Sequence, residues 1–283
     1  MKKGLLLVAA IFITVFSFAQ DAAEKINKAN EALTAQDYAK AYQLYDEAMS
    51  NIGDVQVDAS INFNIGFAAY KAANLEGAVK YFDKAIVAGT NVSKSHEYKA
   101  LAYNDKKDYT NAVASYEQAI ATATEGVDVL NYNAGIAAFR GKLNEKAVEL
   151  FGKAYELGYK GESSIFYKAV ALKALAKDEE YKAALEEGIS KYPGDEKISK
   201  ALATVYVSEG NELYKDGAAI ISAANEKVNA GTLKTDDAAY TAQVEKAKVE
   251  FKEAIEILEK AKALDATNKN VQTLLDACAA ASK

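Results

Sequence analysis

The sequence predicts an all-α protein built from antiparallel helix pairs, and three observations lead to this prediction. Of the 283 residues, 50% are hydrophobic and 26% are charged, which suits a soluble chain with a substantial core. There is one proline, and good helix formers such as Ala, Lys, Glu and Leu dominate, so few helix breaks are expected. The third observation is an internal repeat, which also defines the individual helices.

The repeat is an alanine, three residues, an aromatic residue, two residues and a second alanine. The starts of its first four copies are 37, 34 and 35 residues apart, and the copies are Ala41-Tyr45-Ala48, Ala78-Phe82-Ala85, Ala112-Tyr116-Ala119 and Ala147-Phe151-Ala154. A fifth copy, Ala254-Leu258-Ala261, follows much later. Spacings of four and three place all three residues on one helical face. The small residues would let a neighbouring backbone approach while the aromatic ring fills the gap.

Another helix, the first of each pair, is expected before each of these four helices. A small residue stands twelve positions before each start, at Ala29, Gly66, Ala100 and Gly135. Polar turn residues separate the two helices and can cap the second one, namely Asp37, Asn74, Asp108 and the segment Gly141-Lys142-Leu143-Asn144. One unit is therefore a helix, a turn and an antiparallel helix.

This pattern resembles the tetratricopeptide repeat (TPR) family, whose period is 34 residues. The resemblance covers about Ala22 to Tyr192, and its best copy pairs Phe63–Tyr70 with Ala78–Ala85. It implies a right-handed superhelical stack, a TPR solenoid, with five helix pairs in residues 20–193. The chain departs from the family in lacking the early Trp and in keeping the terminal Pro only at Pro193. The fifth pair is degenerate, with Tyr181, Leu185 and Gly188 at the pattern positions.

A sixth pair, in residues 194–268, is expected to carry an insertion of about 39 residues that forms a long helical hairpin. Its two arms run between Ile198 and Leu264, with a stop at Asn229-Ala230-Gly231 and a restart at Thr235-Asp236. Gly210-Asn211 could instead break the first arm. Residues 269–283 form a final helix that covers the open end of the stack.

Residues 1–19 have the features of a signal peptide for export. Lys2 and Lys3 come first, Leu5 to Phe16 is nearly all apolar, and Ser17-Phe18-Ala19 offers small residues for cleavage after Ala19. An uncleaved anchor helix is the alternative. Cleavage would leave 32 basic and 40 acidic residues in a periplasmic or secreted protein. Such an acidic chain is not expected to bind nucleic acid, and it would meet a membrane only through a protein partner.

The chain offers little for catalysis. His96 is the only histidine, so it can form neither a dyad nor a multi-histidine metal site, and in the family register it takes the place of the missing Trp. Cys278 is the only cysteine and is expected to be a half-buried residue of the last helix. We expect no enzyme, no cofactor and no metal, and we assign His96 a packing role.

The family resemblance implies peptide docking in a concave groove lined by the first helix of each pair. The residues expected to face this groove are Phe63, Phe67, Tyr70, Lys71, Lys94, Leu101, Asn104, Tyr132, Ile136, Phe139, Arg140, Phe166 and Val170. Their rings could bind a ligand or could simply fill the space between units. The carboxylate clamp of some family members matches only at Asn30, Asn64 and Lys94, while Ile26 and Tyr98 replace its cations, so we do not expect a chaperone tail as ligand.

Taken together, the sequence predicts a non-enzymatic scaffold or adaptor in the bacterial cell envelope that binds a protein or peptide in the groove. The alternative is a structural envelope protein that self-assembles through the C-terminal hairpin. An envelope hydrolase or carbohydrate-binding protein that uses His96 is disfavoured. The repeat supports many functions on one scaffold, so the partner, the pathway and the oligomeric state stay open.

Overall fold

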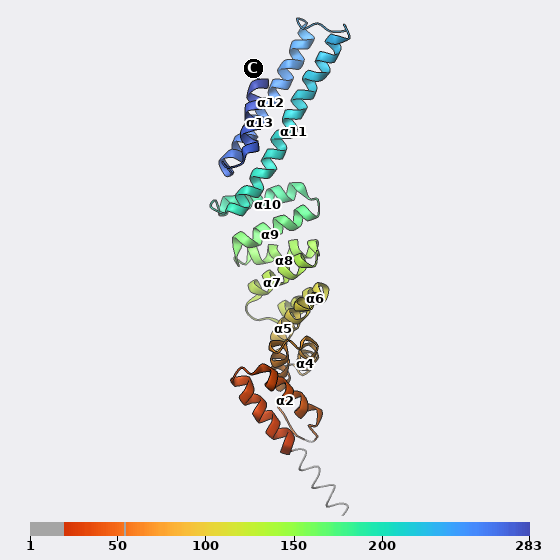
Figure 1. Ribbon diagram of the computed structural model, residues 1–283, viewed down its shortest axis with the longest axis vertical. Coiled ribbons are helices and arrows are strands. Elements are labelled where there is room, and N and C mark those ends of the chain that lie inside the picture. The colour runs from red at the N-terminus through yellow and green to blue at the C-terminus, as the bar shows by residue number, and fades with distance from the viewer. Residues whose placement is uncertain (1–19, 54) are drawn as a thin grey trace, which may run out of the picture. The chain divides into compact units, whose positions relative to one another are not determined.

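The computed structural model describes residues 20–53 and 55–283, and every regular element in these ranges is a helix (Figure 1). The predicted all-α fold of antiparallel helix pairs is confirmed, whereas the predicted signal peptide lies outside the described residues. After a helical segment at residues 20–34, the helices are α2 (Tyr38–Ser50), α3 (Ile61–Lys71), α4 (Leu75–Val87), α5 (Val92–Asp105), α6 (Tyr109–Thr122), α7 (Val127–Arg140), α8 (Asn144–Glu156), α9 (Gly161–Ala174), α10 (Asp178–Lys191), α11 (Glu196–Asn229), α12 (Ala238–Leu264) and α13 (Lys269–Ala281).

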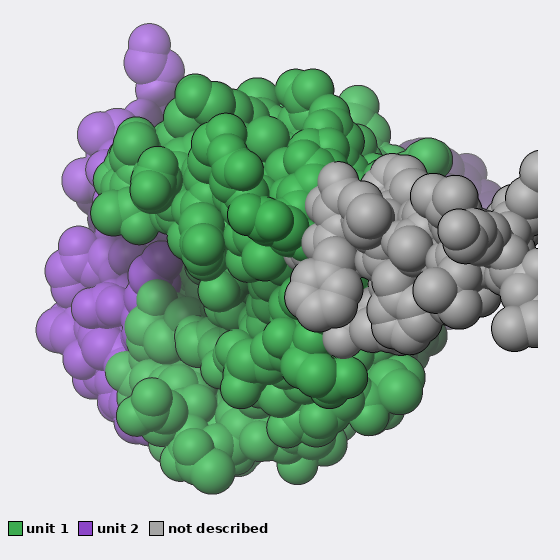
Figure 2. All heavy atoms as spheres, turned by 90° about the horizontal axis from the view of Figure 1, so that it is seen from below, with its two compact units in different colours: residues 1–159 green, residues 160–283 purple. Residues whose placement is uncertain are grey.

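The chain forms two compact units, coloured separately in Figure 2. Unit 1 ends at Tyr159 and holds four helix pairs. Within it, each helix from α2 to α7 contacts the next helix along the chain. Unit 2 runs from Lys160 to Lys283 and holds the pair α9–α10, the hairpin α11–α12 and the final helix α13. Each unit has its own set of helix–helix contacts and is considered by itself below.

The repeat pattern lies in the core, as the helical spacing predicted. Its alanines are fully buried on α2, α4, α6, α8 and α12, and its large side chains are at most 3% exposed: Tyr45, Phe82, Tyr116, Phe151 and Leu258. The degenerate positions of the fifth pair are buried too, at Tyr181, Leu185 and Gly188 on α10. The degenerate copy therefore keeps the burial pattern with different side chains.

The small residues of the first helices receive the rings of the second helices. A Cβ atom placed on Gly66 would lie 2.8 Å from a ring carbon of Phe82, and one on Gly135 would lie 2.9 Å from a ring carbon of Phe151. Real Cβ atoms do not approach a ring this closely, so the absent side chain is what lets each ring reach the facing backbone. Gly66 and Gly135 thus each accommodate a ring of the second helix.

Each turn within a helix pair has the same backbone form. A non-glycine residue with φ between 55° and 60° stands directly before the N-cap in five turns, at Gln36, Ala73, Lys107, Lys142 and Ala176. Three of the N-cap side chains accept a hydrogen bond from a backbone N–H, namely Asp37, Asn74 and Asp108, as expected. In the fourth turn the prediction of a polar N-cap is wrong. There the N-cap is Leu143, which has no side-chain oxygen, and Asn144 is already helical.

The hairpin consists of two long helices, α11 with 34 residues and α12 with 27. Helix α11 continues through Gly210, so the break considered there does not occur. It ends at Asn229, and Gly231 follows with φ 71°, a conformation that suits glycine. Helix α12 begins at Ala238, later than the restart expected at Thr235-Asp236.

Gly210 serves packing rather than termination. The buried small residues of α11 recur every seven positions, at Ala203, Gly210, Gly217 and Ala224, and so form one stripe along the helix. A Cβ atom on Gly210 would lie 2.6 Å from Leu258, and one on Gly217 would lie 2.6 Å from the Phe251 ring. The two arms therefore use the same contact between a small residue and a large side chain as the ordinary pairs.

Helix α13 closes one side of the hairpin. Its residues Val271, Leu275 and Cys278 pack with Ala254 and Leu258 of α12. Cys278 is fully buried rather than half-buried, and burial raises the pKa of its thiol. A buried protonated thiol is a poor nucleophile, which agrees with a packing role. None of the described helices is both long enough and apolar enough to span a bilayer.

We expect Gly217→Ala to destabilise unit 2 by about 1–3 kcal/mol, because the new methyl group overlaps the buried Phe251 ring. Urea unfolding followed by circular dichroism measures the change. Gly194→Ala is the matched control, since no atom lies within 4 Å of its added Cβ, and it should change stability by less than about 0.5 kcal/mol. Equal effects of the two substitutions would contradict this packing account.

Candidate protein-interaction groove

The residues predicted to line the groove fall in both units. Unit 1 carries those on the first helices α3, α5 and α7, and unit 2 carries Phe166 and Val170 on α9. In unit 2 both residues are half-buried, and the Phe166 ring lies 5.9 Å from that of the adjacent Tyr167. Because the richest set belongs to unit 1, the geometry of that unit decides what the groove can do.

Several predicted groove rings of unit 1 pack around Tyr98 of α5. Its ring centroid lies 5.3 Å from that of Phe67, 5.7 Å from Tyr70 and 6.0 Å from Phe63, all at steep interplanar angles. Phe82 of α4 stacks on Tyr98 at 5.8 Å, and Tyr38 of α2 meets Phe67 edge-on at 5.9 Å. We call these six residues the Tyr98 ring cluster. Such edge-to-face and offset contacts are favourable in themselves.

The cluster shows how these rings are used. Phe63, Phe67 and Tyr70 are half-buried and meet other rings of the same unit, so they join neighbouring helix pairs. Tyr132 of α7 is 9% exposed and packs against Phe151 at 5.7 Å and Tyr159 at 5.4 Å. The sequence left two alternatives open for these rings, ligand binding and packing between helix pairs. For Tyr132 and for most of the Tyr98 ring cluster, these contacts favour packing between helix pairs.

The cluster was missed in the sequence because Tyr98 and Tyr38 were not among the predicted groove residues. Tyr98 stands where a clamp cation would be needed, and it was considered only as a departure from that clamp. The spacing could have placed Tyr98 on the groove face, because it lies three residues before Leu101 on the same helix and residues three apart share a helical face.

The remaining predicted groove residues of unit 1 are more accessible. Leu101, Asn104, Ile136 and Phe139 are half-buried, whereas the cations Lys71, Lys94 and Arg140 are exposed. Lys94 pairs with Glu97 at 2.8 Å and lines a cavity of about 420 Å³ together with Thr122–Gly126 and Leu130. The Lys71 ammonium lies 5.6 Å from the centre of the Phe67 ring. These residues combine apolar surface with positive charge.

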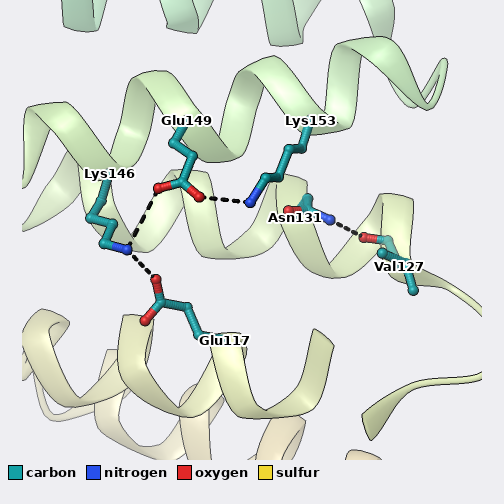
Figure 3. Close-up of polar contacts among 6 residues, drawn as sticks. All are labelled: Glu117, Val127, Asn131, Lys146, Glu149 and Lys153. Carbon is teal, nitrogen blue, oxygen red and sulfur yellow. Dashed lines mark hydrogen bonds and ion pairs between the residues drawn. The ribbon is translucent and has the colours of Figure 1, made fainter. Parts of the chain in front are cut away.

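The second helices present a different surface, on which the charges neutralise one another. In Figure 3, Lys146 of α8 pairs with Glu117 of α6 at 2.6 Å and with Glu149 at 3.5 Å, and Lys153 pairs with the same Glu149 at 2.6 Å. Each exposed pair contributes little to stability. The ladder pairs both lysines of this part of α8 with glutamates, and the first helix α5 has ion pairs of its own, at Lys94–Glu97 and Lys99–Asp83.

Polar residues stand at corresponding positions of α5 and α7, four residues before Ala100 and Gly135. His96 of α5 is half-buried, and Asn131 of α7 is 2% exposed. The Asn131 amide donates to the Val127 carbonyl at 2.7 Å (Figure 3), while its Oδ1 has no hydrogen-bond partner among the described residues. A buried unpaired carbonyl of this kind costs about 1–3 kcal/mol.

The surroundings of His96 favour its neutral form. Burial lowers the pKa of His96, the Lys99 charge lowers it further, and Asp83 opposes both effects. A histidine with a lowered pKa is neutral at pH 7. Within residues 20–53 and 55–283, no group of three or more His, Cys, Asp or Glu side chains is arranged to hold a metal ion.

The lowered pKa of His96 predicts a pH effect on stability. Above the unfolded-state value of about 6.5, both the folded and the unfolded states are neutral at this site. As the pH falls below 6.5 the unfolded state takes up the proton first, so folding becomes less favourable. The melting temperature of His96→Gln minus that of the wild type should therefore increase as the pH falls from about 7.5 to about 5.5. A constant difference would contradict the assignment.

No family model matches the chain. An NADPH oxidase activator from Dictyostelium discoideum is 26% identical over 121 residues, which is 41% of this chain but only 19% of that protein. The chain thus spans about a fifth of the length of this curated relative.

Two solved structures cover 92% of this chain. One is a TPR repeats protein from Bacteroides fragilis, with 21% identity, 98% of its own chain covered and a TM-score of 0.38. The other is a tetratricopeptide repeat protein from Parabacteroides merdae, with 19% identity, 99% covered and a TM-score of 0.48. Independently of these likenesses, the recurring register of small and aromatic residues and the helix pairs that it builds make the chain a helical repeat stack, consistent with a tetratricopeptide repeat protein.

Proposed function

We propose that this chain is a non-enzymatic scaffold that holds a partner protein or peptide against the first helices of unit 1. The observation that supports the proposal is that the apolar side chains of Leu101, Ile136 and Phe139 are partly exposed on α5 and α7, the helices that also carry the exposed cations Lys94 and Arg140. Half-buried apolar side chains with a polar rim are typical of surfaces that exchange water for a partner.

The proposed location is the bacterial cell envelope. Its support is the order of basic, apolar and small residues within positions 1–19, which is typical of an export signal. The acidic composition favours a protein partner over nucleic acid or an anionic membrane surface. The scaffold would therefore hold its partner outside the cytoplasm.

A photo-crosslinking amino acid at Ile136 should capture a defined partner in intact cells, because this side chain lies on the proposed surface. Val87 is the matched control position, since it is 88% exposed and lies at the end of the second helix α4. Mass spectrometry of the crosslinked bands identifies what is attached. The proposal fails if Ile136 and Val87 give the same bands at the same yield.

Self-assembly through the hairpin is the second candidate, and one observation favours it. Residues 217–225 of α11 carry no charge, and near the hairpin end Ile220, Ala223, Leu233 and Ala239 line a cavity of about 530 Å³. On the other arm, Val249 is 52% exposed. Uncharged helix surface of this kind can pair with a second copy.

Sedimentation equilibrium at micromolar concentration tests the pairing. The wild type should show a monomer–dimer equilibrium that Ile220→Lys shifts toward the monomer, because a charge would then be buried between the arms. Ser208→Lys adds the same single charge at an exposed position of α11 outside this stretch and serves as the control. A wild type that stays monomeric at all concentrations removes the hairpin from this role.

A further inference from the structure

The distal part of the hairpin is a two-helix structure with an uncovered face. Helix α13 packs near Leu213 and Tyr214 of α11, and in Figure 1 it ends short of the hairpin loop. Beyond its end, α11 and α12 are the only described helices of this part of unit 2. Two helices bury only the stripes that face each other, so the remaining surface stays in water unless a partner covers it.

One row of residues on this surface combines apolar side chains with a charge at each end. The row consists of Asp216, Ile220, Ala223 and Lys227, and its spacings of four, three and four place all members on one face of α11. Ile220, Ala223 and Lys227 line the same cavity of about 530 Å³. The whole row is about 17 Å long, or three helical turns.

The two charges at the ends of the row are not used within the chain. Asp216 and Lys227 are exposed, and neither has an ion-pair partner among the residues that the structure describes. Residues 217–225 between them carry no charge, although 26% of the chain is charged. The row is thus an apolar patch with one acidic and one basic end.

The order of these residues makes the row complementary to itself in one orientation. Asp216 and Lys227 lie equally far from the midpoint of the row, and so do Ile220 and Ala223. When two such rows lie side by side in opposite directions, Asp216 of each copy meets Lys227 of the other, and Ile220 meets Ala223. Two rows in the same direction would instead place Asp216 on Asp216 and Lys227 on Lys227, which is repulsive.

The apolar contact in the antiparallel arrangement is the one that the hairpin already uses. Leu258 packs against Gly210 and Phe251 against Gly217, each time a large side chain against a small residue. Ile220 against Ala223 repeats this contact between copies, and the two-fold symmetry makes it occur twice. Small side chains at such a crossing let two helices approach closely.

We propose that two copies of the chain pair through this row with their α11 helices antiparallel, with Ile220 against Ala223 and with two Asp216–Lys227 ion pairs. The inference rests on the proposed self-assembly through the hairpin and adds the orientation and the register of the pairing. Exposed ion pairs add little affinity, so their main effect is to select the antiparallel orientation. A contact of three helical turns is small for a protein interface, so the pairing is a reversible equilibrium rather than a permanent dimer.

Charge reversal tests the register on the full chain. Asp216→Lys and Lys227→Asp should each weaken the dimer at least about fivefold in sedimentation equilibrium, because each turns two attractive contacts into repulsive ones. The double variant Asp216→Lys/Lys227→Asp should recover the wild-type affinity, since it only exchanges the partners within each pair. Lys215→Asp is the matched control, because it reverses the same charge at an exposed residue outside the row, and it should change the affinity by less than about twofold.

Crosslinking tests the orientation independently. Cysteine is introduced at Ala223 or at Ala230, two exposed positions that lie seven residues apart on the same side of α11. In the antiparallel arrangement the two copies of residue 223 are about 5 Å apart along the helix axis, and those of residue 230 about 25 Å. A short bismaleimide should therefore link Ala223→Cys chains into dimers but not Ala230→Cys chains. The native Cys278 is fully buried, so the wild type serves as the blank.

The other outcomes separate the orientation from self-assembly itself. Equal linking at both cysteines, or a double charge variant as weak as the single variants, overturns the antiparallel register and leaves self-assembly standing. A wild type that stays monomeric at all concentrations removes self-assembly and the register together. Equal circular dichroism melting curves for all variants show that a loss of pairing does not come from unfolding.

Discussion

The structure depends on one contact, in which a ring or branched side chain of one helix seats against a small residue of the neighbouring helix. Phe82 on Gly66 and Phe151 on Gly135 are its clearest cases in unit 1. The contact needs both partners, because a larger residue on one side would push the helices apart and a smaller residue on the other would leave a cavity. It sets the distance between helices and thereby the positions of all side chains on the first helices.

The same contact explains why the hairpin can be long without a new kind of packing. In α11 the small residues continue at seven-residue intervals beyond the length of an ordinary helix pair, and Leu258 and Phe251 meet them from α12. A regular seven-residue spacing keeps one stripe facing the partner helix. Repetition of a local rule, rather than a separate core, therefore extends the sixth pair.

The fold was largely predictable because it follows from residue spacing. The repeat pattern, with an aromatic residue in four copies and Leu258 in the fifth, identified the buried faces of five helices, and Asp37, Asn74 and Asp108 marked where three of the second helices begin. The role of Gly210 could not be decided from the sequence alone, because a glycine that makes room for a neighbouring side chain and a glycine that ends a helix look the same in a sequence. The difference depends on Leu258, which is 48 residues away along the chain.

The candidate groove was less predictable for a related reason. Membership of a helical face follows from spacing, but the division of rings between packing and binding depends on contacts between pairs. Phe67, for example, was placed on the groove face by its spacing, yet its ring meets those of Tyr38 and Tyr98. Only the three-dimensional arrangement shows that such a ring joins two helix pairs.

The continuity of α11 has a mechanical consequence. Its first turns pack on α10 through Ile198 and Leu202, and the same unbroken helix forms one arm of the hairpin. A helix of 34 residues is about 51 Å long and resists bending because each turn is hydrogen-bonded to the next. A force applied near Asn229 is therefore transmitted as a torque to the α10–α11 contact, so the hairpin works as a stiff lever rather than as a flexible tether.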